Sequence, residues 1–376
     1  MGRYDLADQR AFAAGEPVFA LSDAVGAVRL SGVDALKLLR ALTTLSGEPE
    51  PGGTEALLLG GQGHIMFGLM AVPDGDDFLL LTDGPGTPGG ADATGGPNAT
   101  ETRVGARHQP VFDAVADLLN SRRFRLQAEA APLPSWKALV TRDWVDGIVQ
   151  IGAQDPWPGG ANLPRYALES PHPGTEWTGL TTYLYDPSEA QPLPDQLEAR
   201  GYRQIDAASL EALRIAAWRP LASREAADSK TLPHELDWLR TTTALNSGCY
   251  PGQETVAKII NVGKPPRRLV FLHLDGADAV LPEAGAAVYD YPLPDDQRPV
   301  GRITSVGLHH ELGPIALALV KRTLPEDECL VASVPEDPAG FIAASQVVIV
   351  PGSGESDSRP TARRTAPPKL ASRRRG

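Results

Sequence analysis

The sequence predicts an α+β protein that ends in a unit built only of strands. Up to residue 265, segments with the two-residue apolar repeat of strands alternate with segments that have the helical repeat. Beyond that point, short apolar segments follow one another between turn residues, which is typical of a small β-barrel or sandwich. We therefore expect a body over residues 1–265, a β unit over 266–352 and a disordered basic tail over 353–376.

The first half of the body reads as strands around one helix. Residues 17–32 alternate apolar and polar side chains as a strand does, and a helix over 34–42 follows, with Asp34 as its cap. Glycine-rich or Asp-Gly turns then separate three strand-like segments, at 56–59, 65–72 and 78–82. Residues 84–105 are mostly Gly, Pro, Ala and Thr, so we expect a flexible insert there.

The remaining elements follow from the same patterns. Apolar residues at helical spacing predict three helices, over 111–124, 195–200 and 209–218. Two strands are expected between the first two of these helices, at 138–141 and 147–152. The terminal β unit is expected to contain the segments 269–274, 286–289, 299–306, 314–320, 330–333 and 346–350.

Charge and cysteine content exclude several classes of protein. The net charge of −12 argues against a surface for specific nucleic-acid binding, although the segment from Ser353 to Gly376 carries seven Arg or Lys against two acidic residues. Two cysteines make neither a disulfide framework nor a metal site. There is no apolar run of membrane-spanning length and no signal-peptide core, so we expect a soluble, cytoplasmic protein with no resident metal.

One of the two cysteines lies in a distinctive setting. Cys249 precedes Tyr250 and a Pro-Gly turn, and the residues from Gln253 to Ile260 read as a helix. Pro251 suits the first position of that helix. A thiol at a helix N-terminus is held by the dipole as a thiolate, which makes Cys249 a candidate reactive residue. The alternative is a small residue buried in a tight turn.

The residues around this cysteine carry a resemblance to a known family. The segment Gly248-Cys249-Tyr250-Pro251-Gly252-Gln253-Glu254 resembles the Gly-Cys-Tyr-x-Gly-Gln-Glu signature of the YgfZ family, which is related to the glycine cleavage T-protein. The resemblance covers residues 8–350 and looks like the actinobacterial branch. Supporting stretches are Leu213 to Pro220, Pro233 to Trp238, Lys264 to Leu269, Gly301 to Ser305 and Leu312 to Ala318.

The resemblance implies a fold and a function. The fold would be T-protein-like, with two similar α+β subdomains around a central pocket and a C-terminal β-barrel. The pocket would bind tetrahydrofolate. The function would be iron–sulfur cluster assembly or repair, with Cys249 as the functional thiol and iron–sulfur client or assembly proteins as partners.

Five further residues are candidate contacts for the folate or for a partner. Tyr250 would stack on a ligand or simply pack, and Gln253 and Glu254 lie in a first helical turn, where helix capping also accounts for Glu254. Arg214 would anchor the folate glutamate tail or form an i,i+3 ion pair with Glu211. Lys258 belongs to a basic cluster, with anion binding and a solvated linker face as the alternatives; its other members are Lys264, Arg267 and Arg268.

Departures from the family pattern weigh against transferase chemistry. The catalytic Asp of aminomethyltransferases corresponds to Phe67 or Gly68, and neither can balance a positive iminium. The pterin-binding Glu corresponds to Ala216, and the Lys that often precedes the Gly-Cys-Tyr sequence corresponds to Ser247. The resemblance therefore favours an accessory protein. The alternatives are a folate-dependent aminomethyltransferase or demethylase, and a non-catalytic scaffold with a vestigial pocket.

Overall fold

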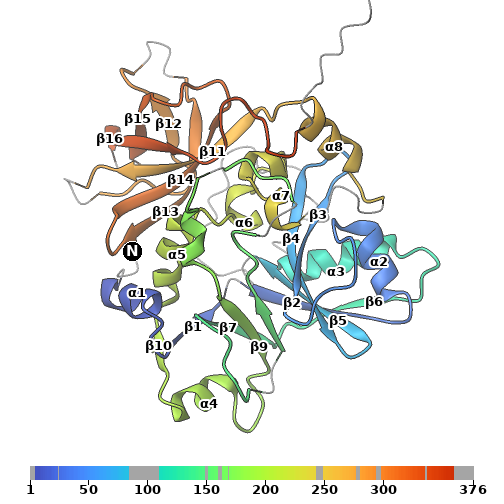
Figure 1. The fold of residues 1–376 in the computed structure, drawn as a ribbon. Coiled ribbons are helices and arrows are strands. Elements are labelled where there is room, and N and C mark those ends of the chain that lie inside the picture. Colours follow the sequence, from blue (N-terminus) through green and yellow to red (C-terminus); the bar gives the residue numbers. More distant parts are fainter. Residues whose placement is uncertain are drawn as a thin grey trace, which may run out of the picture.

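The computed structural model shows two β-sheets and a β-barrel arranged around a group of short helices (Figure 1). None of the helices in the described ranges has both the length and the apolar composition needed to cross a membrane. The structure describes residues 5–23, 25–83, 110–148, 151–159, 163–167, 169–242, 249–276, 280–293, 298–334 and 337–359. The predicted insert at 84–105 and residues 360–376 of the predicted tail lie outside these ranges.

The first sheet has five strands and contains one parallel pair, β1 with β10. In spatial order its strands are β10 (Arg203–Ile205), β1 (Val18–Ser22), β7 (Lys137–Thr141), β9 (Thr181–Tyr185) and β8 (Ile151–Gln154). Helix α4 (Leu193–Ala199) packs beside it and buries Leu193 and Leu197 against Phe19 and Tyr183. The apolar side chains of these short elements thus form a local core.

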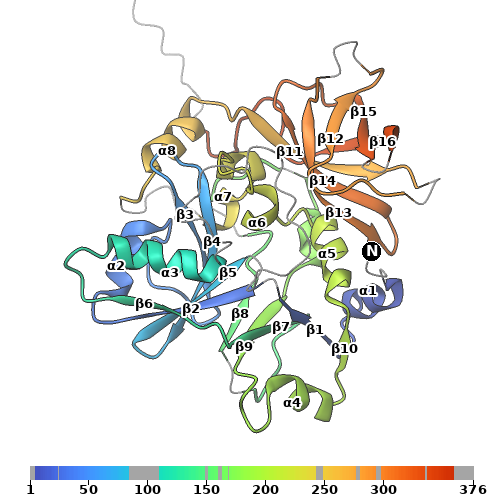
Figure 2. The ribbon, with the colours of Figure 1, turned by 180° about the vertical axis from the view of Figure 1, so that it is seen from behind.

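The second sheet is antiparallel throughout. In spatial order its strands are β3 (Thr54–Leu59), β4 (Ile65–Asp74), β5 (Asp77–Asp83), β2 (Val25–Ser31) and β6 (Glu129–Pro132). Helices α2 (Ala35–Leu42) and α3 (Val111–Arg122) place their apolar faces in a shared core with this sheet (Figure 2). A further apolar cluster joins the two sheets, because Val72 and Leu79 pack with Ala138 and Leu184.

The C-terminal unit is a closed six-stranded barrel, so the barrel alternative is confirmed. Its strands in order are β11 (Arg267–Leu274), β14 (Gly313–Lys321), β13 (Gly301–His309), β12 (Ala287–Asp290), β15 (Cys329–Val334) and β16 (Asp337–Val348). The barrel packs on α5 (Ala207–Ala216) of the body. A Cβ on Gly307 would lie 3.1 Å from the Ala212 Cα, so the absence of a side chain permits this close contact.

Short helices occupy the space between the sheets and the barrel (Figure 1). Their apolar residues share one core with strands from both sheets and the barrel. Members of this core include Trp157, Trp238, Leu57 and Leu317. The set comprises α5, α6 (Ala222–Glu225), the 3₁₀ helix η2 (Pro233–Leu236) and α7 (Leu239–Thr242), and α8 (Gln253–Asn261) lies at the edge, beside the turn between β3 and β4. The remaining helices are α1 (Leu6–Ala13) and the 3₁₀ helix η1 (Pro173–Glu176).

Four predictions of local structure are wrong. The strand expected at 147–152 is β8, over Ile151–Gln154, because the chain turns at Gly147, which has φ 71°. Residues 17–32 form two strands in different sheets, which the alternation could not show because it continues through both. Strand β16 begins at Asp337, well before the predicted residue 346. The Asp337-Pro338 pair at its start reads as a turn in the sequence, so the beginning of the strand was not expected. The predicted disordered tail is ordered over 353–359, because the Arg165 side chain is paired with Asp357 at 2.8 Å.

Candidate functional site

Two glycines fix the segment that carries the cysteine. Gly252 adopts a left-handed backbone conformation, with φ 80°, and precedes the first residue of α8. A Cβ at Gly252 would lie 2.6 Å from both the carbonyl oxygen of Gly60 and the Cα of Gly63. The backbone before α8 therefore rests directly on the turn between β3 and β4. The helix starts at Gln253 because Gly252 has this conformation, so the prediction that Pro251 is the first helical residue is wrong.

The two central residues of the cysteine segment face opposite environments. Cys249 is exposed, whereas Tyr250 is 9% exposed and belongs to the central apolar core. The buried-cysteine alternative is therefore wrong. Cys249 also lies four residues before the first residue of α8, outside the helical turn where the dipole acts most strongly. Ser247 lies outside the described residues.

The predicted contacts on α8 lie on its outer side. Glu254 and Lys258 are both exposed, and their i,i+4 spacing places them on one face of the helix, while Gln253 is half-buried. The predicted basic cluster does not form one surface. Arg267 is paired with Glu235 and Asp228. Arg268 is fully buried and donates to the Leu324 carbonyl and to Gln346. Only Lys258 and Lys264 of this cluster are exposed.

Arg214 is a structural link between α5 and the barrel. It is 3% exposed and forms the i,i+3 ion pair with Glu211 at 2.6 Å. Its other bonds reach Glu225, the Arg219 carbonyl and the Ser305 hydroxyl of β13. All three guanidinium nitrogens of Arg214 are thus bonded within the chain. A role as the folate-tail anchor would require some of these bonds to break.

A second arginine organises a buried polar network at the centre of the molecule. Arg219 donates to Glu55 of β3 at 2.5 Å and to Asp155, just after β8, at 3.0 Å. Its guanidinium also lies over the rings of Trp157 and Trp238. Burial disfavours the charge, but Asp155 and Glu55 together raise the pKa of Arg219. Arg219 therefore joins the two sheets through one cation.

Asp83 brings a third carboxylate to this network. It ends β5, and its Oδ2 accepts the backbone N–H groups of Ala222 and Ser223 at the start of α6. Burial raises the pKa of Asp83 to about 6, although these hydrogen bonds and Arg219 oppose the shift. A Cβ on Gly68 would lie 3.2 Å from Asp83 Oδ1 and 3.1 Å from the Trp238 ring. Asp83 therefore lies beside the position where aminomethyltransferases are expected to carry their carboxylate.

The network leaves one donor and one acceptor without partners. Asp83 Oδ1 and Arg219 Nη1 are both buried, and neither has a hydrogen-bond partner in the described part of the chain. A buried polar atom without a partner carries a desolvation penalty of about 1–3 kcal/mol, which a ligand with the complementary group would remove. Ala216, at the end of α5, supplies no polar group.

The sequence interpretation missed Glu55, Asp83, Asp155 and Arg219 as site residues. Two of them carried a signal. Glu55 is an acidic residue directly before four apolar residues of a strand, and Asp83 directly follows a run of three leucines and a threonine. A carboxylate in such a place is buried and therefore needs a partner. The partner itself, Arg219, could not be found from spacing, because it lies 164 residues from Glu55.

Comparison with known proteins defines the class of fold. Residues 267–343 match the glycine cleavage T-protein C-terminal barrel domain. The whole chain resembles the crystal structure of glycine cleavage system aminomethyltransferase T from Bartonella henselae, with a TM-score of 0.62, 14% identity, and coverage of 92% of this chain and 89% of that chain. The predicted T-protein-like α+β fold is thereby confirmed.

A curated relative matches a smaller part of the chain. The Arabidopsis thaliana protein named "Putative transferase At1g60990, chloroplastic" is 28% identical over 163 residues. This match covers 43% of the present chain and 35% of the relative, so it spans about a third of that protein's length.

Proposed function

We propose that this protein binds tetrahydrofolate and acts as an accessory protein in the assembly or repair of iron–sulfur clusters, with Cys249 as its functional thiol. The observation that carries the proposal is the placement of the cysteine segment. Cys249 is exposed, its neighbour Tyr250 enters the central core, and Gly252 seats the segment on the turn between β3 and β4. An exposed thiol suits exchange with a partner protein better than chemistry inside a closed pocket.

The central network supports the folate part of the proposal. Asp83 Oδ1 and Arg219 Nη1 would hold the pterin, since they are the unpartnered polar atoms described above. The Trp238 ring also lies beside Gly68. Bound tetrahydrofolate would supply a carrier for one-carbon groups. Tyr250, Gln253, Glu254 and Lys258 remain proposed contacts of the folate or of the partner, and Arg214 would become one only by giving up some of its bonds within the chain.

We expect Asp83→Ala to weaken tetrahydrofolate binding by about 10- to 150-fold, because a charge-assisted hydrogen bond contributes about 1.5–3 kcal/mol. Isothermal titration calorimetry of the full chain with tetrahydrofolate measures this directly. Asp77→Ala is the matched control, since Asp77 begins the same strand but pairs with Arg29. Absence of tetrahydrofolate binding by the unaltered protein would refute the folate assignment, and equal affinities would exclude Asp83 as a ligand.

A second function, folate-dependent aminomethyl transfer or demethylation, is favoured by Asp83 itself. The sequence suggests that no carboxylate is present at Phe67 or Gly68, yet the structure places one beside Gly68 from the neighbouring strand. Such a group could balance the positive charge of an iminium. Formation of methylene-tetrahydrofolate from a methylamine donor by the purified protein, lost in Asp83→Ala, would establish this function. No turnover with glycine-derived or methylated amines would eliminate it.

A further inference from the structure

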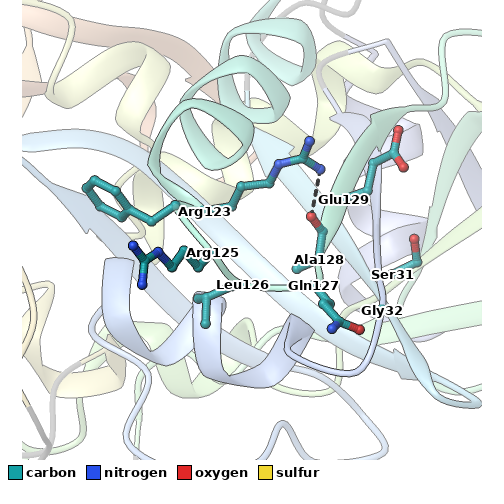
Figure 3. Close-up of a pocket in the computed structure, with 9 residues that line it drawn as sticks. Ser31, Gly32, Arg123, Arg125, Leu126, Gln127, Ala128 and Glu129 are labelled. Carbon is teal, nitrogen blue, oxygen red and sulfur yellow. Dashed lines mark hydrogen bonds between the residues drawn. The ribbon is translucent and has the colours of Figure 1, made fainter.

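A shallow surface depression lies on the second sheet, between the end of α3 and the start of α2 (Figure 3). Its volume is about 460 Å³, and it is lined by Ser31, Gly32 and the segment 123–129. None of the residues assigned to the central site or to the cysteine segment lines it. Whatever this surface does is therefore separate from folate and from Cys249.

The two most exposed large apolar side chains in the described part of the chain border this depression. Phe124 lines it and is 90% exposed, and Val33, which is 87% exposed, directly follows Gly32. Phe124 also has a left-handed backbone, with φ 50°, which is unfavourable for a bulky residue. A folded chain gains nothing for its own stability by presenting an aromatic ring in this way, so the arrangement points to a function in binding.

Three arginines flank Phe124 in the sequence, and the guanidinium of one of them, Arg123, points toward the Ala128 carbonyl (Figure 3). Arg122, Arg123 and Arg125 are all exposed, and none of them forms an ion pair with another described residue. Only Arg123 has an internal hydrogen bond, to the Ala128 carbonyl at 2.9 Å. A protein with a net charge of −12 thus has exposed guanidinium groups next to an apolar side chain, and Glu129 is the one carboxylate among the residues that line the depression.

The backbone under this surface is held firmly. Two hydrogen bonds join Asp34 and Gln127. The Asp34 N–H donates to the Gln127 carbonyl at 3.1 Å, and the Gln127 N–H donates to Asp34 Oδ2 at 2.8 Å. Gly32, with φ 107°, lies so close that a Cβ there would be 2.3 Å from the Gln127 carbonyl oxygen. The site is therefore formed before any partner arrives, which lowers the entropic cost of binding.

We propose that this surface, formed by Val33, Phe124 and the three flanking arginines, docks an acidic peptide segment of a partner protein. Guanidinium groups bind carboxylates in a bidentate manner, and arginine and aromatic residues dominate the binding energy of protein interfaces. The occupant should therefore carry carboxylates on either side of an apolar side chain. A nucleic acid fits less well, because the negative net charge of the chain repels a long polyanion but tolerates a short acidic segment.

The test compares a double variant with a matched control in the full chain. Phe124→Asn with Arg125→Glu removes the ring and reverses one charge, and Asn tolerates a left-handed backbone. Val262→Asn with Lys321→Glu makes the equivalent changes, an exposed apolar side chain to Asn and a cation to Glu, at other exposed positions, after α8 and at the end of β14. The probes are a fluorescent 12-residue peptide of alternating Glu and Leu, its Gln–Leu counterpart, and a 12-nucleotide polyuridylate.

We expect the Glu–Leu peptide to bind the unaltered protein and the control variant equally, and the Phe124→Asn/Arg125→Glu variant at least tenfold more weakly. Any binding by the basic C-terminal residues is common to all three proteins, so it cancels in this comparison. The Gln–Leu peptide should bind weakly to all of them. Equal binding of the Glu–Leu peptide by the two double variants, no binding of it at all, or tighter and variant-sensitive binding of polyuridylate would each overturn the proposal.

Discussion

Replacing Cys249 with serine is expected to abolish the activity of the protein in cells. In a strain that lacks the gene, the Cys249→Ser variant should restore the activity of iron–sulfur enzymes no better than an empty vector. Serine matches the cysteine in size, but its hydroxyl neither exchanges sulfur nor binds iron as a thiolate does. Because the residue is exposed, the substitution should leave the fold intact. Activity of one iron–sulfur enzyme, measured in extracts and normalised to protein level, is the readout.

The other cysteine provides the matched control. Cys329 is also exposed and begins strand β15 of the barrel, far along the chain from the signature segment. Cys329→Ser should restore enzyme activity fully. Full restoration by Cys249→Ser would refute the proposed role of the thiol, and equal failure of both variants would show that the assay reports stability rather than function.

The largest expected effect on stability comes from Glu55→Ala. Glu55 is 5% exposed and accepts hydrogen bonds from Arg219, from the Trp238 ring N–H at 3.0 Å and from the Thr241 hydroxyl. Its removal leaves a buried guanidinium short of one carboxylate, the Trp238 ring N–H without its acceptor, and the Thr241 hydroxyl with only a long bond to the Trp238 carbonyl. We expect a loss of about 3–5 kcal/mol in the free energy of unfolding, the effect of breaking a buried ion pair. Urea unfolding followed by tryptophan fluorescence measures it.

An ion pair at the surface of the same sheet serves as the control. Asp74 pairs with Arg29 at 2.6 Å, but both side chains are about one-third exposed, and Arg29 keeps Asp77 as a second partner. Asp74→Ala should therefore change the free energy of unfolding by less than about 1 kcal/mol. If Glu55→Ala shifted the urea midpoint no further than Asp74→Ala, the central network would not stabilise the fold.

The sequence predicted secondary structure best for segments whose own residue pattern defines the element. The helix over 111–122 and the barrel strands from β11 to β15 follow from repeats that each segment displays by itself. The alternation across residues 17–32 failed because which sheet a strand joins depends on distant partners, here β7 and β10 for one strand and β5 and β6 for the other. Local spacing carries no information about such pairing.

The candidate site shows the same division. The signature around Cys249 is one contiguous segment, so sequence alone identified this residue as a candidate. Its exposure is known only from the fold. Arg214 illustrates the opposite case, because an arginine expected to hold a ligand is instead satisfied by Glu211, Glu225 and Ser305. Only the fold reveals that Glu225 and the barrel reach it. Likewise, only the fold shows that a carboxylate lies beside Gly68, because it comes from the neighbouring strand, at Asp83.

The contact between Gly252 and Gly63 sets how the surface thiol is positioned. It is an approach of backbone to backbone, so no side chain can rotate to loosen it, and a methyl group on Gly252 would force the two segments apart. The turn in that contact also connects the strand bearing Glu55 to the strand bearing Gly68. The main chain next to the cysteine is thus in direct contact with the turn that joins the strands of Glu55 and Gly68, so the thiol and the buried network are connected through backbone.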